Sequence, residues 1–248
     1  MLDIGFRPDI ERILRRVPRE RQTLLMSATL PADVLKLAVR YMIKPLHINL
    51  APKRITVEKI HQKYITVDKE RKFELLLRVL DLEQPKQCII FCERKLWSQR
   101  LFEKLRHHQR SVAAMHGDLQ QNEREAIMRR FKDGSLHLLV ATDVVGRGID
   151  VTGITHIINY ELPEDPENYV HRIGRTGRIG KNGVAIAFVT REQGEQLTRI
   201  EQFINKQIEK YEIDGFEAVA PRQEGQPEAP KAHAPVFGRK GRKHSRRP

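Results

Sequence analysis

The chain has 248 residues, of which 40% are hydrophobic and 31% charged, and its formal net charge is +13 at pH 7. This length suffices for one large domain with appendages, and no apolar run approaches the ~20 residues that a membrane-spanning helix needs. No charged segment followed by an apolar stretch opens the chain, so a cytoplasmic rather than a secreted protein is expected. The excess of positive charge favours a polyanionic partner such as nucleic acid.

The first fifty residues alternate between helical and extended apolar patterns. Apolar residues at helical spacing predict one helix around residues 10–17 and a second around residues 34–41, with Thr29 as a candidate cap. Short apolar runs predict strands at residues 23–26 and 46–50. Because this piece is too short for a whole α/β domain, we interpret residues 1–50 as part of one.

Residues 51–59 have little apolar periodicity and are interpreted as a linker. Beyond them, apolar runs again alternate with amphipathic stretches, which is typical of a doubly wound parallel α/β sheet. The predicted domain covers residues 60–213. Its predicted strands are residues 63–67, 88–92, 112–115, 136–141, 154–158 and 184–189, and one intervening helix is predicted to begin near Asp118.

Two further features complete the outline. Cys88 and Cys92 lie four residues apart in one strand, roughly 13 Å, which is too far for a disulfide. From residue 214 onwards Pro, Gly, Gln and charged residues dominate, which predicts a disordered basic tail over residues 214–248.

Three segments carry residues suited to phosphate or ribose. His171, Arg172, Arg175 and Arg178 belong to one segment in which three arginines recur every third residue between glycines. The planar guanidinium matches phosphate oxygens, and glycine permits a close approach of the backbone. The open alternative is a surface basic patch with scattered ion pairs.

The second segment runs from Thr142 and Asp143 through Gly148 to Asp150, directly after a predicted strand. Ligands of open α/β sheets bind at the carboxyl ends of strands, so Thr142 is a candidate phosphate ligand and Asp150 a candidate ribose ligand. Each aspartate taken alone fits a turn or cap equally well.

The third segment places Gly117 before a helix that carries Gln121 and Arg124. A glycine and a helix N-terminus can offer amides to a phosphate, although Gly-Asp before a helix is also ordinary capping. Ser27 and Thr29, in Ser-Ala-Thr, read by themselves only as a strand exit and cap.

Taken together and in this order, these segments resemble the second half of a DEAD-box ATP-dependent RNA helicase. The resemblance rests on Ser27-Ala28-Thr29, Ile89-Ile90-Phe91, the Gln121-x-x-Arg124 pair, residues 142–150 and residues 171–178, and it reaches to about residue 213. It implies a RecA-like C-terminal domain preceded by the end of a first RecA-like domain. The leading His171 and the Ser-Ala-Thr favour this branch over DEAH relatives and DNA helicases.

The resemblance also implies roles. Arg175 and Arg178 correspond to arginine fingers, while Arg172, His171, Ser27 and Thr29 correspond to residues that couple hydrolysis to domain closure. Gly148 and Asp150 correspond to ATP-binding positions. The implied RNA-binding residues are Gly117, Gln121, Arg124, Thr142 and Asp143.

The implied partners are RNA, ATP and a further N-terminal RecA-like domain, around a monomeric enzyme. No Gly-x-x-x-x-Gly-Lys-Ser/Thr and no Asp-Glu-Ala-Asp occur in the chain. ATP and Mg²⁺ are therefore expected to need residues supplied by that other domain, with no metal ligand in this chain, and the chain alone is not expected to hydrolyse ATP. The hypothesis is thus a fragment of a helicase. The alternative is a stand-alone RNA-binding module or helicase regulator.

Overall fold

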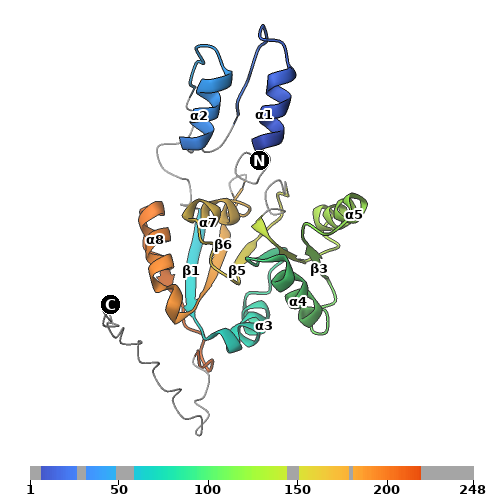
Figure 1. The fold of residues 1–248 in the computed structure, drawn as a ribbon. Helices are drawn as coiled ribbons and strands as arrows, with labels where there is room; N and C mark the ends of the chain where they lie inside the picture. Colours follow the sequence, from blue (N-terminus) through green and yellow to red (C-terminus); the bar gives the residue numbers. More distant parts are fainter. Residues whose placement is uncertain (1–6, 27–31, 49–58, 144–150, 179–180, 219–248) are drawn as a thin grey trace, which may run out of the picture.

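The computed structural model describes residues 7–26, 32–48, 59–143, 151–178 and 181–218. Within these ranges a seven-stranded, all-parallel sheet has the order β3-β4-β2-β5-β6-β1-β7 (Figure 1). The strands are β1 (Ile60–Thr66), β2 (Cys88–Phe91), β3 (Val112–Met115), β4 (Leu138–Ala141), β5 (His156–Asn159), β6 (Gly183–Val189) and β7 (Glu209–Lys210). The doubly wound parallel α/β domain expected from the sequence is confirmed.

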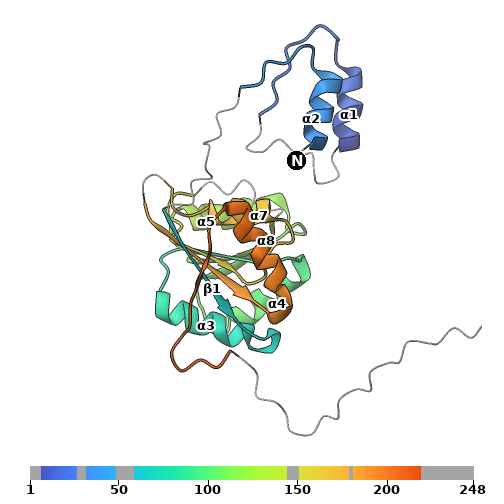
Figure 2. The ribbon, with the colours of Figure 1, turned by 90° about the vertical axis from the view of Figure 1, so that its left-hand side faces the viewer.

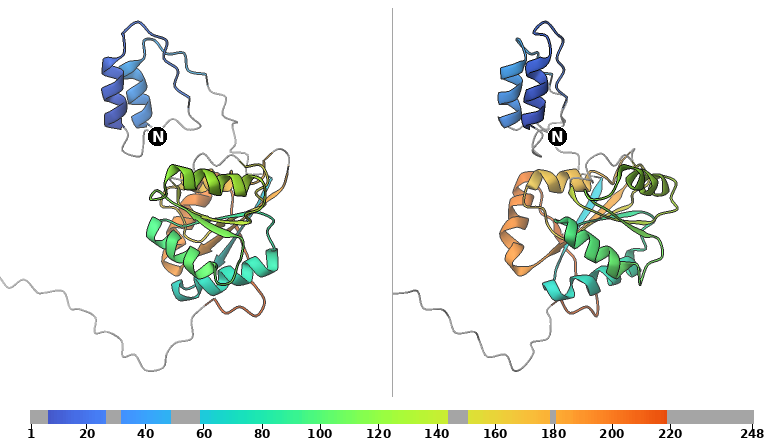
Figure 3. Two further views of the ribbon diagram at one scale, coloured as in Figure 1. Left: turned by 90° about the vertical axis from the view of Figure 1, so that its right-hand side faces the viewer. Right: turned by 45° about the vertical axis from the view of Figure 1, so that its right-hand side comes forward.

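Helices cover both faces of this sheet (Figure 3). The apolar clusters place α3 (Lys72–Glu83) and α4 (Lys95–Leu105) on one face. They place α5 (Gln121–Lys132), α7 (Pro166–Ile173) and α8 (Gly194–Ile204) on the other. Two short 3-10 helices, Lys69–Arg71 and Arg191–Gln193, precede α3 and α8.

Strands β2 and β4 are apolar at every position because both of their faces are covered. In β2, Cys88 and Ile90 contribute to the core under α3 and α4, whereas Ile89 and Phe91 contribute to the core under α5. Both cysteines are buried free thiols, and burial raises the pKa of each far above its usual value. These thiols therefore act as small apolar core residues.

The N-terminal piece contains two helices, α1 (Arg7–Arg16) and α2 (Ala32–Tyr41), which lie side by side (Figure 2). Arg21 joins the segment after α1 to the end of α2, because its guanidinium donates to the backbone oxygens of Pro18 (2.8 Å) and Tyr41 (3.1 Å).

The strands predicted at residues 23–26 and 46–50 are not found: residues 23–26 and 46–48 form no strand, and residues 49–50 lie outside the described ranges. Met26 and Leu46 are each 85% exposed. An extended segment needs neighbouring strands to satisfy its backbone, and the described residues place none beside these segments.

The packed chain continues beyond residue 213, where the sequence pattern suggested that the domain ends. The Phe216 ring packs against the core and lies 4.7 Å from the Arg71 guanidinium. The amide of Asp68 donates to the backbone oxygen of Ala218 at 3.0 Å. Aromatic anchors thus hold this segment despite its polar composition. None of the helices described is long and apolar enough to cross a membrane.

Candidate nucleotide and RNA interface

The carboxyl ends of four adjacent strands, β3, β4, β2 and β5, lie level with one another. In the register of the sheet, Ala141 pairs with both Met115 and Phe91, and Phe91 pairs with Asn159. The residues that follow these positions therefore emerge along one edge. They include Gly117 after β3, Thr142 and Asp143 after β4, and Glu161 after β5, so the parallel sheet gathers two of the sequence-predicted segments.

Arg172 of α7 reaches this edge from within the domain. Its side chain is only 1% exposed. Nε and Nη2 donate to the two carboxylate oxygens of Asp143 at 2.6 and 2.8 Å. Nη1 donates to Asn159 Oδ1 at 3.1 Å and to the backbone oxygen of Glu161 at 2.6 Å, and the guanidinium lies 5.1 Å from the centre of the Phe91 ring.

This arrangement satisfies a buried charge with a bidentate ion pair and two further acceptors. It ties α7 to the ends of β4 and β5 in a fixed geometry. The carboxylate of Asp143, predicted to bind RNA, is occupied by Arg172 in this structure, and Arg172 is directed into the domain. Both side chains are thus placed to position their neighbours.

The other two arginines follow within the same segment. Arg175 is half-buried and its Nε donates to the backbone oxygen of His171 at 3.3 Å, while Arg178 Nε donates to that of Gly174 at 3.0 Å. Between them, Thr176 is buried and its hydroxyl donates to the backbone oxygens of Ile154 (2.7 Å) or Thr155 (3.1 Å).

Gly177 allows the turn that follows α7. Its φ is +68°, and a Cβ added there would lie 2.9 Å from Ile60 Cγ1. A side chain at this position would be strained both in conformation and in packing. The segment therefore alternates inward anchors, Arg172 and Thr176, with the half-buried Arg175 and Arg178.

Around the end of β3, Gly117 is exposed, and a Cβ added to it would meet no atom within 4 Å. The following helix begins at Gln121, three residues later than predicted, because Gln120 and Glu123 form a capping box. Gln121 donates to Glu125 Oε1 at 2.9 Å, and Arg124 is half-buried on the same helix. Open space thus lies beside the Gly117 backbone.

Four predicted site residues, Ser27, Thr29, Gly148 and Asp150, lie outside the described residues. Thr142 is described and is only 6% exposed. His171 lies one residue before Arg172 and is half-buried.

The comparisons with known proteins agree on one family. The family model described as "Helicase conserved C-terminal domain" matches residues 71–180. The DEAD-box ATP-dependent RNA helicase CshA of Bacillus cereus is 44% identical over 210 residues, which are 85% of this chain and 40% of the relative. The structure of Saccharomyces cerevisiae Dbp5 bound to RNA and ADP BeF3 matches with a TM-score of 0.78 and 32% identity, over 85% of this chain and 56% of that one.

A further match is the structure of the Escherichia coli DEAD-box protein SrmB bound to the regulator of ribonuclease activity A. The match covers 65% of this chain and 98% of the SrmB chain. The identity is 31% and the TM-score 0.58. The chain belongs to the DEAD-box helicase family. It spans about two fifths of the length of the curated CshA relatives that it matches.

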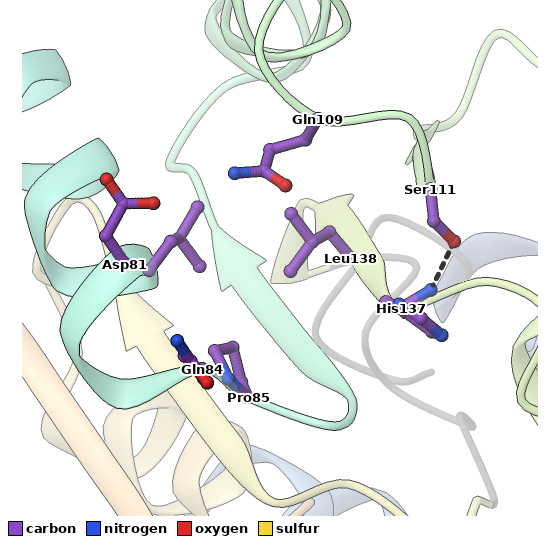
Figure 4. Close-up of a pocket in the computed structure, with 8 residues that line it drawn as sticks. Asp81, Gln84, Pro85, Gln109, Ser111, His137 and Leu138 are labelled. Carbon is purple, nitrogen blue, oxygen red and sulfur yellow. Dashed lines mark hydrogen bonds between the residues drawn. The ribbon is translucent and has the colours of Figure 1, made fainter.

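The predicted site residues that the structure describes belong to the segments around Arg172, and a groove lies elsewhere on the domain. An open groove at the amino-terminal ends of β2, β3 and β4 is lined by Asp81, Gln84, Gln109, Ser111 and His137, among others (Figure 4). None of the predicted site residues lines it. The described residues contain no group of three or more His, Cys, Asp or Glu side chains placed to hold a metal ion.

Three residues of this candidate site were not predicted from the sequence: Asn159, Glu161 and Thr176. Asn159 is fully buried although it is polar, and it ends the apolar run of β5. A polar residue that closes a buried strand is a signal that could have found it, since such a group needs an internal partner.

Proposed function

We propose that this chain is the part of a DEAD-box RNA helicase that holds the RNA backbone at one edge of its sheet and presents Arg175 and Arg178 to ATP bound by another RecA-like domain. The observation that supports this most directly is the bidentate pair of Arg172 with Asp143. It joins the segment predicted to touch RNA to the segment predicted to touch the nucleotide.

On the RNA side, the proposal relies on groups that contact the backbone rather than the bases. Gly117 has open space beside it, and Gln121 and Arg124 follow on α5. Thr142 lies on the same edge, directly after the carboxyl end of β4. Contacts to phosphate and sugar carry little sequence information, so binding with weak sequence preference is expected. We assign Asp143 a positioning role, because Arg172 already occupies its carboxylate.

On the nucleotide side, an arginine supplied across a cleft stabilises the charge that develops on the transferred phosphate. Arg175 and Arg178 suit that role because each is anchored to the backbone through Nε. Asp150 and Gly148 are proposed to meet the ribose, and His171, Ser27 and Thr29 to couple hydrolysis to closure. Because the sequence contains no Gly-x-x-x-x-Gly-Lys-Ser/Thr and no Asp-Glu-Ala-Asp, we expect ATP and Mg²⁺ to need phosphate and metal ligands from the other domain.

RNA binding is tested with the purified 248-residue chain and a labelled single-stranded RNA, followed by fluorescence anisotropy at several salt concentrations. Binding should weaken as salt rises. Arg124→Ala should weaken it further, while the matched Arg129→Ala, an exposed arginine on the same helix, should change it little. Equal effects of the two substitutions would contradict the proposed RNA edge.

The nucleotide role is tested by adding the N-terminal RecA-like domain of a CshA relative, in trans or fused. RNA-stimulated ATP hydrolysis should appear only in the combination. Arg175→Lys or Arg178→Lys should lower its rate by roughly 10³-fold or more, the range for arginine fingers. Hydrolysis by the chain alone would refute the dependence on a second domain. Tight RNA binding with no activity in any combination would favour a stand-alone RNA-binding module.

A further inference from the structure

One side of helix α4 carries a half-exposed tryptophan followed by two cationic residues. Trp97, Arg100 and Lys104 are spaced by three and four residues, which places them on one side of a helix. His108 continues the series in the turn just beyond α4. We call these four residues the α4 stripe. None of its positions is acidic, and the one glutamate of α4, Glu103, is engaged with Gln99 and Arg106.

The aromatic rings of this region each have a cation close by. Trp97 is 47% exposed, and the Arg100 guanidinium lies 5.4 Å from the centre of its ring. The Lys104 ammonium lies 5.4 Å from the ring of Phe73 in the neighbouring α3, and His108 meets the same ring edge-on at 5.6 Å. Because Trp97 is 47% exposed, part of its ring is available to stack on a base.

The stripe starts beside the proposed RNA edge. Helix α4 begins four residues after the carboxyl end of β2. Its first turns are tied to the loop after β3, because Lys95 pairs with Asp118 at 3.0 Å and Gln99 bonds His116 at 3.0 Å. From there the eleven residues of α4 extend about 16 Å away from that edge. A strand leaving the edge would meet Trp97 first and then the cations.

We propose that the α4 stripe is an additional binding track for single-stranded RNA, in which a base stacks on Trp97 while Arg100 and Lys104 hold the adjoining phosphates. Aromatic rings interleaved with basic side chains are the general means by which proteins bind single strands without reading sequence. The positive stripe complements the phosphate charge. This inference rests on the proposed RNA-binding function and assigns a path beyond the edge itself.

The test uses a property of the sequence, because Trp97 is the only tryptophan in the chain. Its fluorescence should be quenched as oligo-uridylate is added to the full chain, with the same midpoint as the anisotropy titration. Trp97→Ala should weaken binding roughly 5- to 100-fold, the range for removing one stacked base. Trp97→Phe should retain much of the affinity. The control Phe203→Ala removes a similarly exposed aromatic, 43% exposed on α8, and should leave affinity unchanged.

A second variant tests the cations. Replacing both Arg100 and Lys104 by Gln should lower the slope of log affinity against log salt by about 1.4, since each phosphate that is no longer neutralised removes about 0.7. RNA binding without tryptophan quenching, and with unchanged affinity of Trp97→Ala, would overturn the track but leave the proposed function standing. A protein ligand that quenches Trp97 while RNA does not would also overturn it. Absence of any RNA binding by the wild-type chain would overturn both.

Discussion

Replacing Arg172 by Met should destabilise the sheet domain by about 3 kcal/mol. The substitution keeps an unbranched side chain beside Phe91 but removes every donor. The carboxylate of Asp143, the amide oxygen of Asn159 and the backbone oxygen of Glu161 then lose the guanidinium. Each buried acceptor left without a donor costs about 1–3 kcal/mol. The Asp143 side chain is 26% exposed and can bind water after the substitution. The total loss of stability is therefore smaller than the sum of the costs for the three acceptors.

For a domain of this size, about 3 kcal/mol lowers the melting temperature by roughly 6–12 °C. Calorimetry or urea unfolding of the full chain measures the change. Arg199→Met provides the matched control, because Arg199 is an exposed arginine on α8. It should shift the melting temperature by no more than about 2 °C.

A double-mutant cycle with Asp143→Asn isolates the pair. Either single substitution leaves one charged partner without its counterpart, whereas the double substitution removes both charges. The free-energy cost of the double substitution should therefore be about 1–3 kcal/mol smaller than the sum of the two single costs. Additive costs, or a melting temperature for Arg172→Met equal to that of the Arg199 control, would refute the view that Arg172 holds this edge together.

Three more outcomes are expected. Gly177→Ala should cost about 1–2 kcal/mol in urea unfolding, because φ is +68° and the added methyl meets β1; Gly194→Ala, with open space and helical dihedrals, should be neutral or stabilising. Burial lowers the pKa of His156 below 6.5. The unfolded chain therefore takes up the proton first, so stability should fall as pH drops below 6.5 and level off below the folded pKa. His156→Gln should remove this part of the pH dependence, and identical pH profiles would contradict it. Removing residues 239–248, which include six arginines and lysines, should lower the slope of log affinity against log salt by up to about 4. An unchanged slope would exclude these residues from contact with RNA.

The parallel sheet was predictable because β2, β4 and β6 are short apolar runs, and both faces of the sheet are covered by helices whose apolar residues recur at helical spacing. The strands predicted in the N-terminal piece, at residues 23–26 and 46–50, were wrong for the residues that the structure describes. Residues 23–26 have the composition of a buried strand, yet Met26 is 85% exposed. A strand depends on hydrogen bonds to residues elsewhere, and composition cannot report whether those residues stand beside it.

The start of α5 shows a second limit. Asp118 resembles an ordinary cap in the sequence, but the helix begins at Gln121, where Gln120 and Glu123 satisfy the first amides reciprocally. Glutamine is not among the favoured capping residues. Asp118 and Gln120 could each cap this helix. The path that the chain takes as it leaves β3 decides between them, and that path depends on the whole fold.

The burial of Arg172 was the least predictable feature of the site. Spacing by three suggested that Arg172, Arg175 and Arg178 share one face, and arginine is seldom fully buried. In the structure α7 ends at Ile173, so that only Arg172 of the three lies within the helix. Its principal partner, Asp143, is 29 residues away in sequence, beyond the reach of any local pattern.

Of the three arginines, Arg172 is buried inside the domain, whereas Arg175 and Arg178 are half-buried. The guanidinium of Arg172 holds the side-chain carboxylate of Asp143, the residue next to Thr142 at the proposed RNA edge. Arg175 follows Arg172 by three residues. We infer that, if RNA displaces this edge, the ion pair of Arg172 with Asp143 carries the displacement to the segment that holds Arg175 and Arg178. If RNA and nucleotide binding reinforce each other, Arg172→Lys should reduce that reinforcement more than it reduces either affinity alone. Loss of both affinities in equal measure, with the coupling intact, would assign Arg172 to stability only.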